Sequence, residues 1–136
     1  MATTTATITL NSSDLTGDPL SLSTTTSLYK AGQTVGLENT SGIGRTKVTS
    51  GSPVDLYTAA NYASPAAGTG AHKIYLANKS TDAQEYFTIK VDDEVIGLLY
   101  AGDWMFFPWS ASTNADISYT ASVTTGMVIE HMIISE

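Results

Sequence analysis

The chain has 136 residues, which is enough for one domain that buries about two-thirds of its unfolded surface and too few for two domains of ordinary size. Only 14% of the residues are charged, and 13 acids against 6 lysines and arginines give a net charge of −7. This acidic balance excludes nucleic acid as an expected partner, because phosphate binding needs clustered basic side chains. The absence of cysteine excludes disulfides, thiolate metal sites and a cysteine nucleophile.

The first ten residues are rich in threonine, and at positions 5–10 threonine and alanine alternate with Ile8 and Leu10, which predicts a short strand there. They lack the basic and apolar regions of a signal peptide, and no apolar run in the sequence is long enough to cross a membrane. We therefore expect a soluble chain without a membrane partner. Within a single β domain over residues 1–136, we expect residues 1–10 to form an N-terminal arm or a strand exchanged between subunits.

Further strands are indicated by short alternating apolar segments that lie between glycine-rich or polar turns. The predicted segments are 20–28, 43–48, 53–57, 71–77, 117–123 and 127–134, together with a three-stranded meander over 87–109. Residues 59–70 are expected to form a loop with at most one helical turn. A count of roughly eight to ten short strands predicts an all-β chain, folded as a single-domain antiparallel β-sandwich or a jelly-roll-like barrel.

The register of the meander follows from matching apolar partners across its first hairpin. A two-residue loop at Asp93-Glu94 pairs apolar residues throughout, whereas a loop at Asp92-Asp93 would place Val91 opposite Glu94. We therefore favour the first loop. It pairs Val91 with Ile96, Ile89 with Leu98, and Phe87 with Tyr100.

The second turn of the meander is expected at Gly102-Asp103, because a type II′ hairpin favours glycine at its first central position. This turn sets Tyr100 against Met105 and Leu98 against Phe107. The predicted core face then consists of Phe87, Ile89, Val91, Ile96, Leu98, Tyr100, Met105, Phe107 and Trp109.

The opposite face of the meander carries Leu99, Trp104 and Phe106, which is unusual for a surface in contact with water. This face is expected either to be covered by the chain itself or to contact a partner. Together with Ile8 and Leu10 of the N-terminal strand, these three residues form the interface predicted from the sequence.

Residues with catalytic or metal-binding chemistry are few. His72 and His131 have no second histidine, cysteine or serine at the spacing of a triad or metal site, and His131 is expected to be a hydrogen-bonded structural residue. The acidic run 92–94 is explained by a hairpin loop, because calcium needs six to eight converging oxygens. Glu130 is embedded in apolar sequence but has no evident carboxylate partner for glycoside hydrolysis. We therefore predict no enzyme activity, no cofactor and no metal.

One further binding chemistry is open to the chain. An exposed tryptophan can stack on a sugar ring, and the predicted register leaves Trp104 free for that role while it places Trp109 in the core. A carbohydrate-binding module therefore stays as an alternative.

Residues 96–110, Ile-Gly-Leu-Leu-Tyr-Ala-Gly-Asp-Trp-Met-Phe-Phe-Pro-Trp-Ser, are followed by Asp-Ile-Ser-Tyr-Thr-Ala-Ser at 116–122 and by a short strand that ends Ile-Ile-Ser-Glu at 133–136. With the threonine-rich opening, this sequence resembles small virion proteins of tailed bacteriophages, most of all the capsid decoration or cement proteins of marine phages and cyanophages. The resemblance lies in style and strand order over most of the chain and includes no catalytic motif.

The resemblance implies a non-enzymatic β protein that is made in the host cytoplasm and placed on the capsid surface of the virion. The implied partners are the major capsid protein and copies of the chain itself, and we expect a closed oligomer such as a trimer. The alternative is a module of a tail fibre or baseplate that binds a carbohydrate or a receptor.

Overall fold

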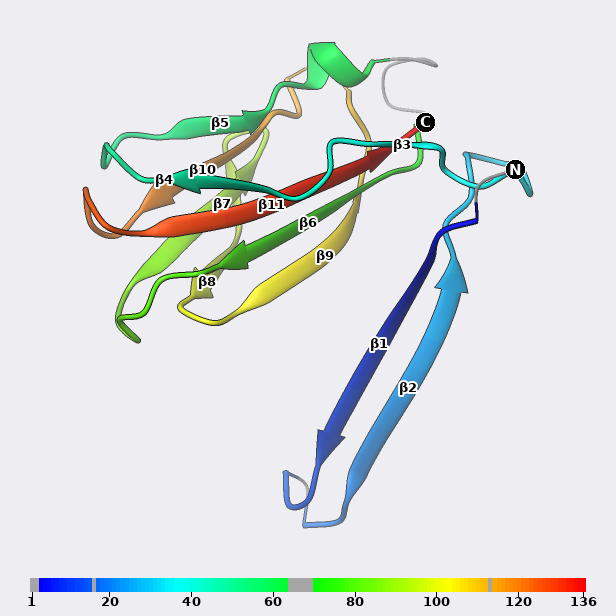
Figure 1. The fold of residues 1–136 in the computed structure, drawn as a ribbon, viewed down its shortest axis with the longest axis horizontal. Coiled ribbons are helices and arrows are strands. Elements are labelled where there is room, and N and C mark those ends of the chain that lie inside the picture. Colours follow the sequence, from blue (N-terminus) through cyan, green and yellow to red (C-terminus); the bar gives the residue numbers. More distant parts are fainter. Residues whose placement is uncertain (1–2, 16, 64–69, 113) are drawn as a thin grey trace. The chain divides into compact units, whose positions relative to one another are not determined.

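The computed structural model describes residues 3–15, 17–63, 70–112 and 114–136, and these form eleven strands and one short 3-10 helix (Figure 1). Every strand pair is antiparallel, so the predicted all-β antiparallel sandwich is confirmed. The strands are β1 Thr5–Ser12, β2 Leu20–Ser27, β3 Asn39–Thr40, β4 Gly44–Lys47, β5 Val54–Tyr57, β6 His72–Asn78, β7 Tyr86–Val91, β8 Glu94–Tyr100, β9 Trp104–Trp109, β10 Ile117–Ala121 and β11 Val128–Ser135. The helix η1 covers Ala59–Tyr62, which agrees with the single helical turn predicted there, and residues 64–69 of that predicted loop lie outside the described residues.

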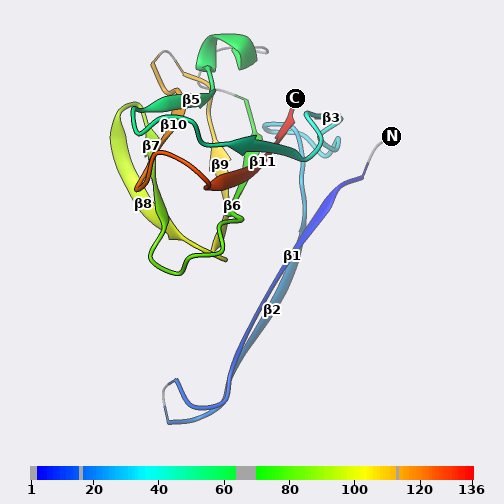
Figure 2. The ribbon, with the colours of Figure 1, turned by 60° about the vertical axis from the view of Figure 1, so that its left-hand side comes forward.

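The chain divides into two compact units, Met1–Glu38 and Asn39–Glu136. In the first unit, β1 and β2 form a two-stranded ribbon whose register runs without interruption from Thr5 opposite Ser27 to Ser12 opposite Leu20 (Figure 2). The predicted arm at residues 1–10 thus contains most of β1, which continues to Ser12 and pairs with a strand of its own chain.

The second unit is a sandwich of two sheets. One sheet has the strand order β5-β10-β7-β8. In the other, β11 lies at the centre, with β3 and β4 along one side and β6 followed by β9 on the other (Figure 1). The last strand of the chain therefore holds together the sheet that contains it.

The core fills the space between these two sheets, because alternate side chains of each strand point inward. Phe87 and Tyr119 meet edge to face with their ring centroids 5.2 Å apart, and the indole N–H of Trp109 donates to the carbonyl of Ala115 at 2.8 Å. Burying one large apolar side chain contributes about 1.5–3 kcal/mol to stability. The residues with 0% exposure are Ile74, Leu76, Phe87, Ile89, Ile117, Met127 and Ile129.

The hairpin between β7 and β8 has its two-residue loop at Asp92-Asp93, so the predicted loop at Asp93-Glu94 is wrong. Asp92 and Asp93 have φ angles of +52° and +61°, as the two central residues of a type I′ turn require, and Val91 lies opposite Glu94. The right-handed twist of a hairpin favours this turn, and aspartate tolerates the left-handed conformation. Turn geometry therefore outweighs a single unmatched apolar pair.

A bulge in β8 then reverses the predicted inward face of this strand. Lys90 pairs with Val95 and Ile89 pairs with Gly97, so Ile96 has no partner on β7. Beyond the bulge, Leu99 is 4% exposed and belongs to the core, whereas Leu98 is 50% exposed. The predicted core positions Ile96, Leu98 and Tyr100 are wrong, because one extra residue exchanges the two faces.

The third strand of the predicted meander lies in the other sheet. Asp103 donates its amide to the carbonyl of Tyr100 at 2.9 Å, and Gly102, at the third position of this turn, has a φ of +87°, as in a type II turn. The chain then crosses to the second sheet, where β9 pairs with β6. The predicted β8–β9 pairing is therefore wrong, although Trp109 is buried as expected.

Candidate functional site

One face of the ribbon is made only of hydroxyl and amide side chains. Thr7 and Thr25 share a hydroxyl hydrogen bond of 2.8 Å, and the hydroxyl of Ser21 donates to Oδ1 of Asn11 at 3.0 Å. Such cross-strand pairs stabilise a ribbon by about 0.2–1 kcal/mol each. The whole hydroxyl face consists of Thr5, Thr7, Thr9, Asn11, Ser21, Ser23, Thr25 and Ser27.

The other face of the ribbon, here called the leucine face, carries its apolar side chains. Leu10 lies opposite Leu22, and these two leucines are 49% and 47% exposed, while Ile8 is half-buried. Its apolar members are Ala6, Ile8, Leu10, Leu20 and Leu22. The predicted interface residues Ile8 and Leu10 therefore lie side by side on one amphipathic surface, and neither strand contains a charged residue.

The other three predicted interface residues do not share a face. Leu99 is buried in the core, whereas Trp104 is 54% exposed and Phe106 is half-buried on the outer face of the second sheet, opposite Ala77 and Tyr75. The prediction that the three form one surface is wrong, because it rested on a pairing of β8 with β9. On β8, three residues that were predicted for the core are exposed instead, namely Ile96, Leu98 and Tyr100.

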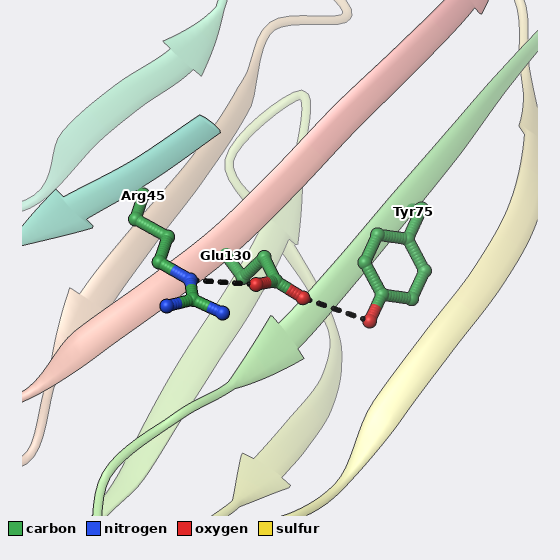
Figure 3. A network of polar contacts seen from close by, with 3 residues as sticks. All are labelled: Arg45, Tyr75 and Glu130. Carbon is green, nitrogen blue, oxygen red and sulfur yellow. Dashed lines mark hydrogen bonds and ion pairs between the residues drawn. The ribbon is translucent and has the colours of Figure 1, made fainter. Parts of the chain in front are cut away.

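Glu130 is the centre of a polar network on the outer face of the second sheet (Figure 3). It is only 7% exposed, its Oε2 accepts a hydrogen bond from Nε of Arg45 at 2.7 Å, and its Oε1 accepts one from the hydroxyl of Tyr75 at 3.2 Å. The bond from Arg45 is the main cause that lowers the pKa of Glu130 below its usual value. One carboxylate oxygen is thus held by the ion pair with Arg45 and the other by the hydrogen bond from Tyr75.

His131 connects the two sheets of the sandwich. Its Nδ1 lies 2.9 Å from the hydroxyl of Tyr57, and its Nε2 lies 3.1 Å from Oγ1 of Thr46. Burial lowers the pKa of His131 and raises the pKa of Tyr57 to about 12, so the neutral imidazole and the neutral phenol are favoured. This is the hydrogen-bonded histidine that the sequence predicted.

The order of groups from Thr46 through His131 to Tyr57 resembles a nucleophile, a base and an orienting group. Neither of the two hollows of the sandwich described below is lined by any of these three residues. Neither hollow therefore brings a substrate to the hydroxyl of Thr46. We interpret the hydrogen bonds of Thr46, His131 and Tyr57 as a polar contact between the two sheets.

Two hollows share Asn114 and Asp116 as lining residues. One has a volume of about 370 Å³ and is lined mainly by small residues around η1. The other has a volume of about 420 Å³ and a polar lining of Asp55, Asp92, Asp93, Asn114, Asp116 and Ser118. Within the described ranges, no three histidine or acidic side chains are grouped as metal ligands would be. Glu94 of the acidic run is not among the lining residues.

Comparison with protein-family models, curated proteins and solved structures finds no significant match to this chain. In the part of the chain that the structure describes, no helix is long and apolar enough to span a bilayer. The ribbon is the clearest candidate for a functional surface, because its strands carry exposed leucines and no charged residue.

Proposed function

We propose that this chain is a non-enzymatic structural protein of a tailed-phage particle that decorates the capsid and stabilises it by bridging coat subunits. The resemblance of residues 96–110 and 116–122 to small virion proteins motivates this role. The observation that carries it is the ribbon, an uncharged, amphipathic β element with its leucines half exposed.

A two-stranded sheet is marginally stable in water when it stands alone. The ribbon gains stability when a partner covers its leucine face and so removes these side chains from water. An exposed apolar face of this kind is typical of an interaction surface. A particle protein meets this condition, because it acts only after it has bound to its assembly.

The proposed mechanism is mass action. A protein that binds the assembled shell and not the free coat subunit stabilises the shell by its own binding free energy at each occupied site. A shell presents the same surface many times, so a modest affinity at each site adds up over the particle. The partners are the major capsid protein and copies of the chain itself.

The test is co-expression with the major capsid protein encoded in the same genome, followed by sedimentation of the assembled shells. We expect the chain to sediment with the shells and not with free coat subunits, and to raise the temperature at which the shells dissociate. A chain that stays in the supernatant at saturating concentration would contradict the decoration role.

The alternative, a tail-fibre or baseplate module that binds carbohydrate or receptor, has two observations in its favour. Trp104 is 54% exposed and available for stacking on a sugar ring, and the larger hollow is lined by aspartate and asparagine side chains that bind hydroxyl groups. Binding to a glycan array that is lost in Trp104→Ala, without binding to shells, would favour this function instead.

A further inference from the structure

We propose that the free edge of β1 pairs with β1 of a second copy, so that two ribbons join into one four-stranded antiparallel sheet about a two-fold axis. This inference rests on the self-association named in the proposed function and specifies the surface that carries it.

Each outer strand of the sandwich carries a feature that discourages pairing with another chain. On the β11 side, β3 has two residues, and β4 contains Arg45 and Lys47. At the opposite edge of that sheet, β9 contains Pro108, which has no amide hydrogen to donate. Short length, charge and proline are the ways in which natural sheets protect their edges.

The other sheet is protected in the same manner. Its edge strand β5 has four residues and includes Asp55. Its other edge strand, β8, is interrupted by the bulge at Ile96 and is closed at its end by Asp103, whose Oδ2 accepts the amide hydrogen of Tyr100 at 3.1 Å. Strand addition to the sandwich is therefore unfavourable at all of these edges.

The ribbon has none of these protective features. Both of its strands are eight residues long, and neither contains a charge, a proline or a bulge. In a chain with a net charge of −7, the ribbon strands offer copies of the chain a neutral surface for approach. A joined pair of ribbons has four strands, which exceeds the three that a stable sheet with an apolar face needs.

The hydrogen-bond pattern shows which groups of β1 point outward. Leu28 donates its amide to the carbonyl of Thr4 at 2.9 Å, so the alternation of an antiparallel ladder directs the amides and carbonyls of Ala6, Ile8 and Leu10 toward β2. The amides and carbonyls of Thr5, Thr7, Thr9 and Asn11 then point away from β2. These outward groups are the ones that a second β1 can bind.

A two-fold axis through Ile8 gives a register in which nearly the whole of β1 overlaps. Ile8 then lies opposite its own copy, Ala6 lies opposite Leu10, and Thr7 lies opposite Thr9, so like meets like on both faces. An equivalent axis at Thr24 of β2 would place Leu22 opposite Thr26. The side-chain match therefore favours the β1 edge over the β2 edge.

The test uses the full-length chain and a matched pair of double variants, Thr7→Pro with Thr9→Pro and Thr7→Ala with Thr9→Ala. Both pairs lose the Thr7–Thr25 hydroxyl bond, but only proline removes the outward amide hydrogens. By sedimentation equilibrium we expect a dimer for the parent and the alanine variant. For the proline variant we expect dimerisation weaker by at least about a hundredfold, because four intermolecular hydrogen bonds are lost.

A second proline pair, Ser23→Pro with Thr25→Pro, places the same change at the opposing outward positions of β2. We expect this variant to dimerise like the parent, which would show that proline in the ribbon does not by itself prevent assembly. Loss of the dimer in the β2 variant would overturn the assignment to the β1 edge.

Three other results would overturn the proposal. These are a monomeric parent, a trimer as expected from the sequence, or a parent-like dimer in the β1 proline variant. A dimer lost in Leu10→Ser with Leu22→Ser but kept in the β1 proline variant would show that leucine faces, and not strand edges, form the contact. Coat binding is measured separately. A dimer that does not bind shells contradicts the decoration role and leaves this inference standing, whereas a monomer that binds shells contradicts the self-association and leaves the decoration role standing.

Discussion

The sandwich and the ribbon are built from the same kinds of residue and reach opposite states of burial. In the sandwich, alternate residues of β7 and β10 are fully enclosed, and Phe87, Ile89 and Ile117 are 0% exposed. In the ribbon, Leu10, Leu20 and Leu22 stay 40–49% exposed. The difference shows that regular strand pairing does not require enclosed apolar side chains, since the ribbon pairs over eight positions while its leucines stay exposed.

Hydrogen exchange should give the largest difference between the two regions. In dilute monomer, we expect amides of β7 and β10 to exchange only through global unfolding and those of β1 and β2 to exchange through local opening, a difference of about 5 kcal/mol or more in opening free energy. Mass-spectrometric exchange of peptides from both regions measures this. Equal protection of the ribbon and sandwich amides at low protein concentration would contradict the expected difference. Slower exchange of the β1 amides at higher protein concentration would support pairing of the ribbon with a second copy.

Two adjacent leucines of β8 test the faces within the sandwich. Leu99→Ala should destabilise the protein by about 2–5 kcal/mol, because it empties a core position, whereas Leu98→Ala should cost less than about 1 kcal/mol. Leu22→Ala in the ribbon should leave the unfolding midpoint of the sandwich unchanged. Urea denaturation of the three variants gives the values. A larger loss for Leu98→Ala would restore the register expected from the sequence.

The turn between β7 and β8 offers a stabilising change of smaller size. Asp93 has a φ of +61°, where glycine is favoured over residues with a side chain, so Asp93→Gly should raise stability by about 0.5–1 kcal/mol. Glu94→Gly serves as the matched control, because Glu94 is a strand residue that pairs with Val91. Thermal melts compare the two. Stabilisation by the Glu94 change instead would place the loop one residue further along the chain.

The smallest expected effect is a pH dependence of the stability of the sandwich. Because burial lowers the pKa of His131, the folded state binds fewer protons than the unfolded state between that lowered pKa and about 6.5. Stability should therefore fall as the pH drops from 7 toward 5, and this slope should be reduced in His131→Gln, which keeps a partner for Tyr57. Denaturation midpoints at several pH values measure the slope. An unchanged slope in the variant would show that another group is responsible.

Much of this fold could be predicted from the sequence, because period-two alternation and turn residues are local signals. The strands at 5–12, 20–27, 72–78, 117–121 and 128–135 agree with the predicted segments within a few residues. The faces of β8 could not be predicted in this way. The bulge at Ile96 shifts the pairing by one position, and nothing in the local sequence distinguishes Leu98 from Leu99.

The candidate surfaces divide in the same manner. Ile8 and Leu10 could be found because they alternate with threonines within one strand, and the structure places them together. The Arg45–Glu130 pair could not be found, because its members are separated by 85 positions and meet only when β4 pairs with β11. The pairing of β9 with β6 could not be predicted either, because a tight turn after β8 is compatible with a hairpin and with a crossing to the other sheet.

The central place of β11 also has a consequence for the timing of folding during synthesis. The ribbon is a local hairpin and can close within microseconds of leaving the ribosome, because its two strands are close together in the sequence. The sheet that contains β3, β4 and β6 has to wait, since β11 emerges after every other strand described here and bonds to all three. Until then, β6 presents to solvent the edge that later pairs with β11, together with apolar side chains such as Ile74 and Leu76, a state in which nascent chains aggregate. The sandwich should therefore complete its folding only after its last strand has been released, and chaperones that hold nascent chains should affect its yield more than that of the ribbon.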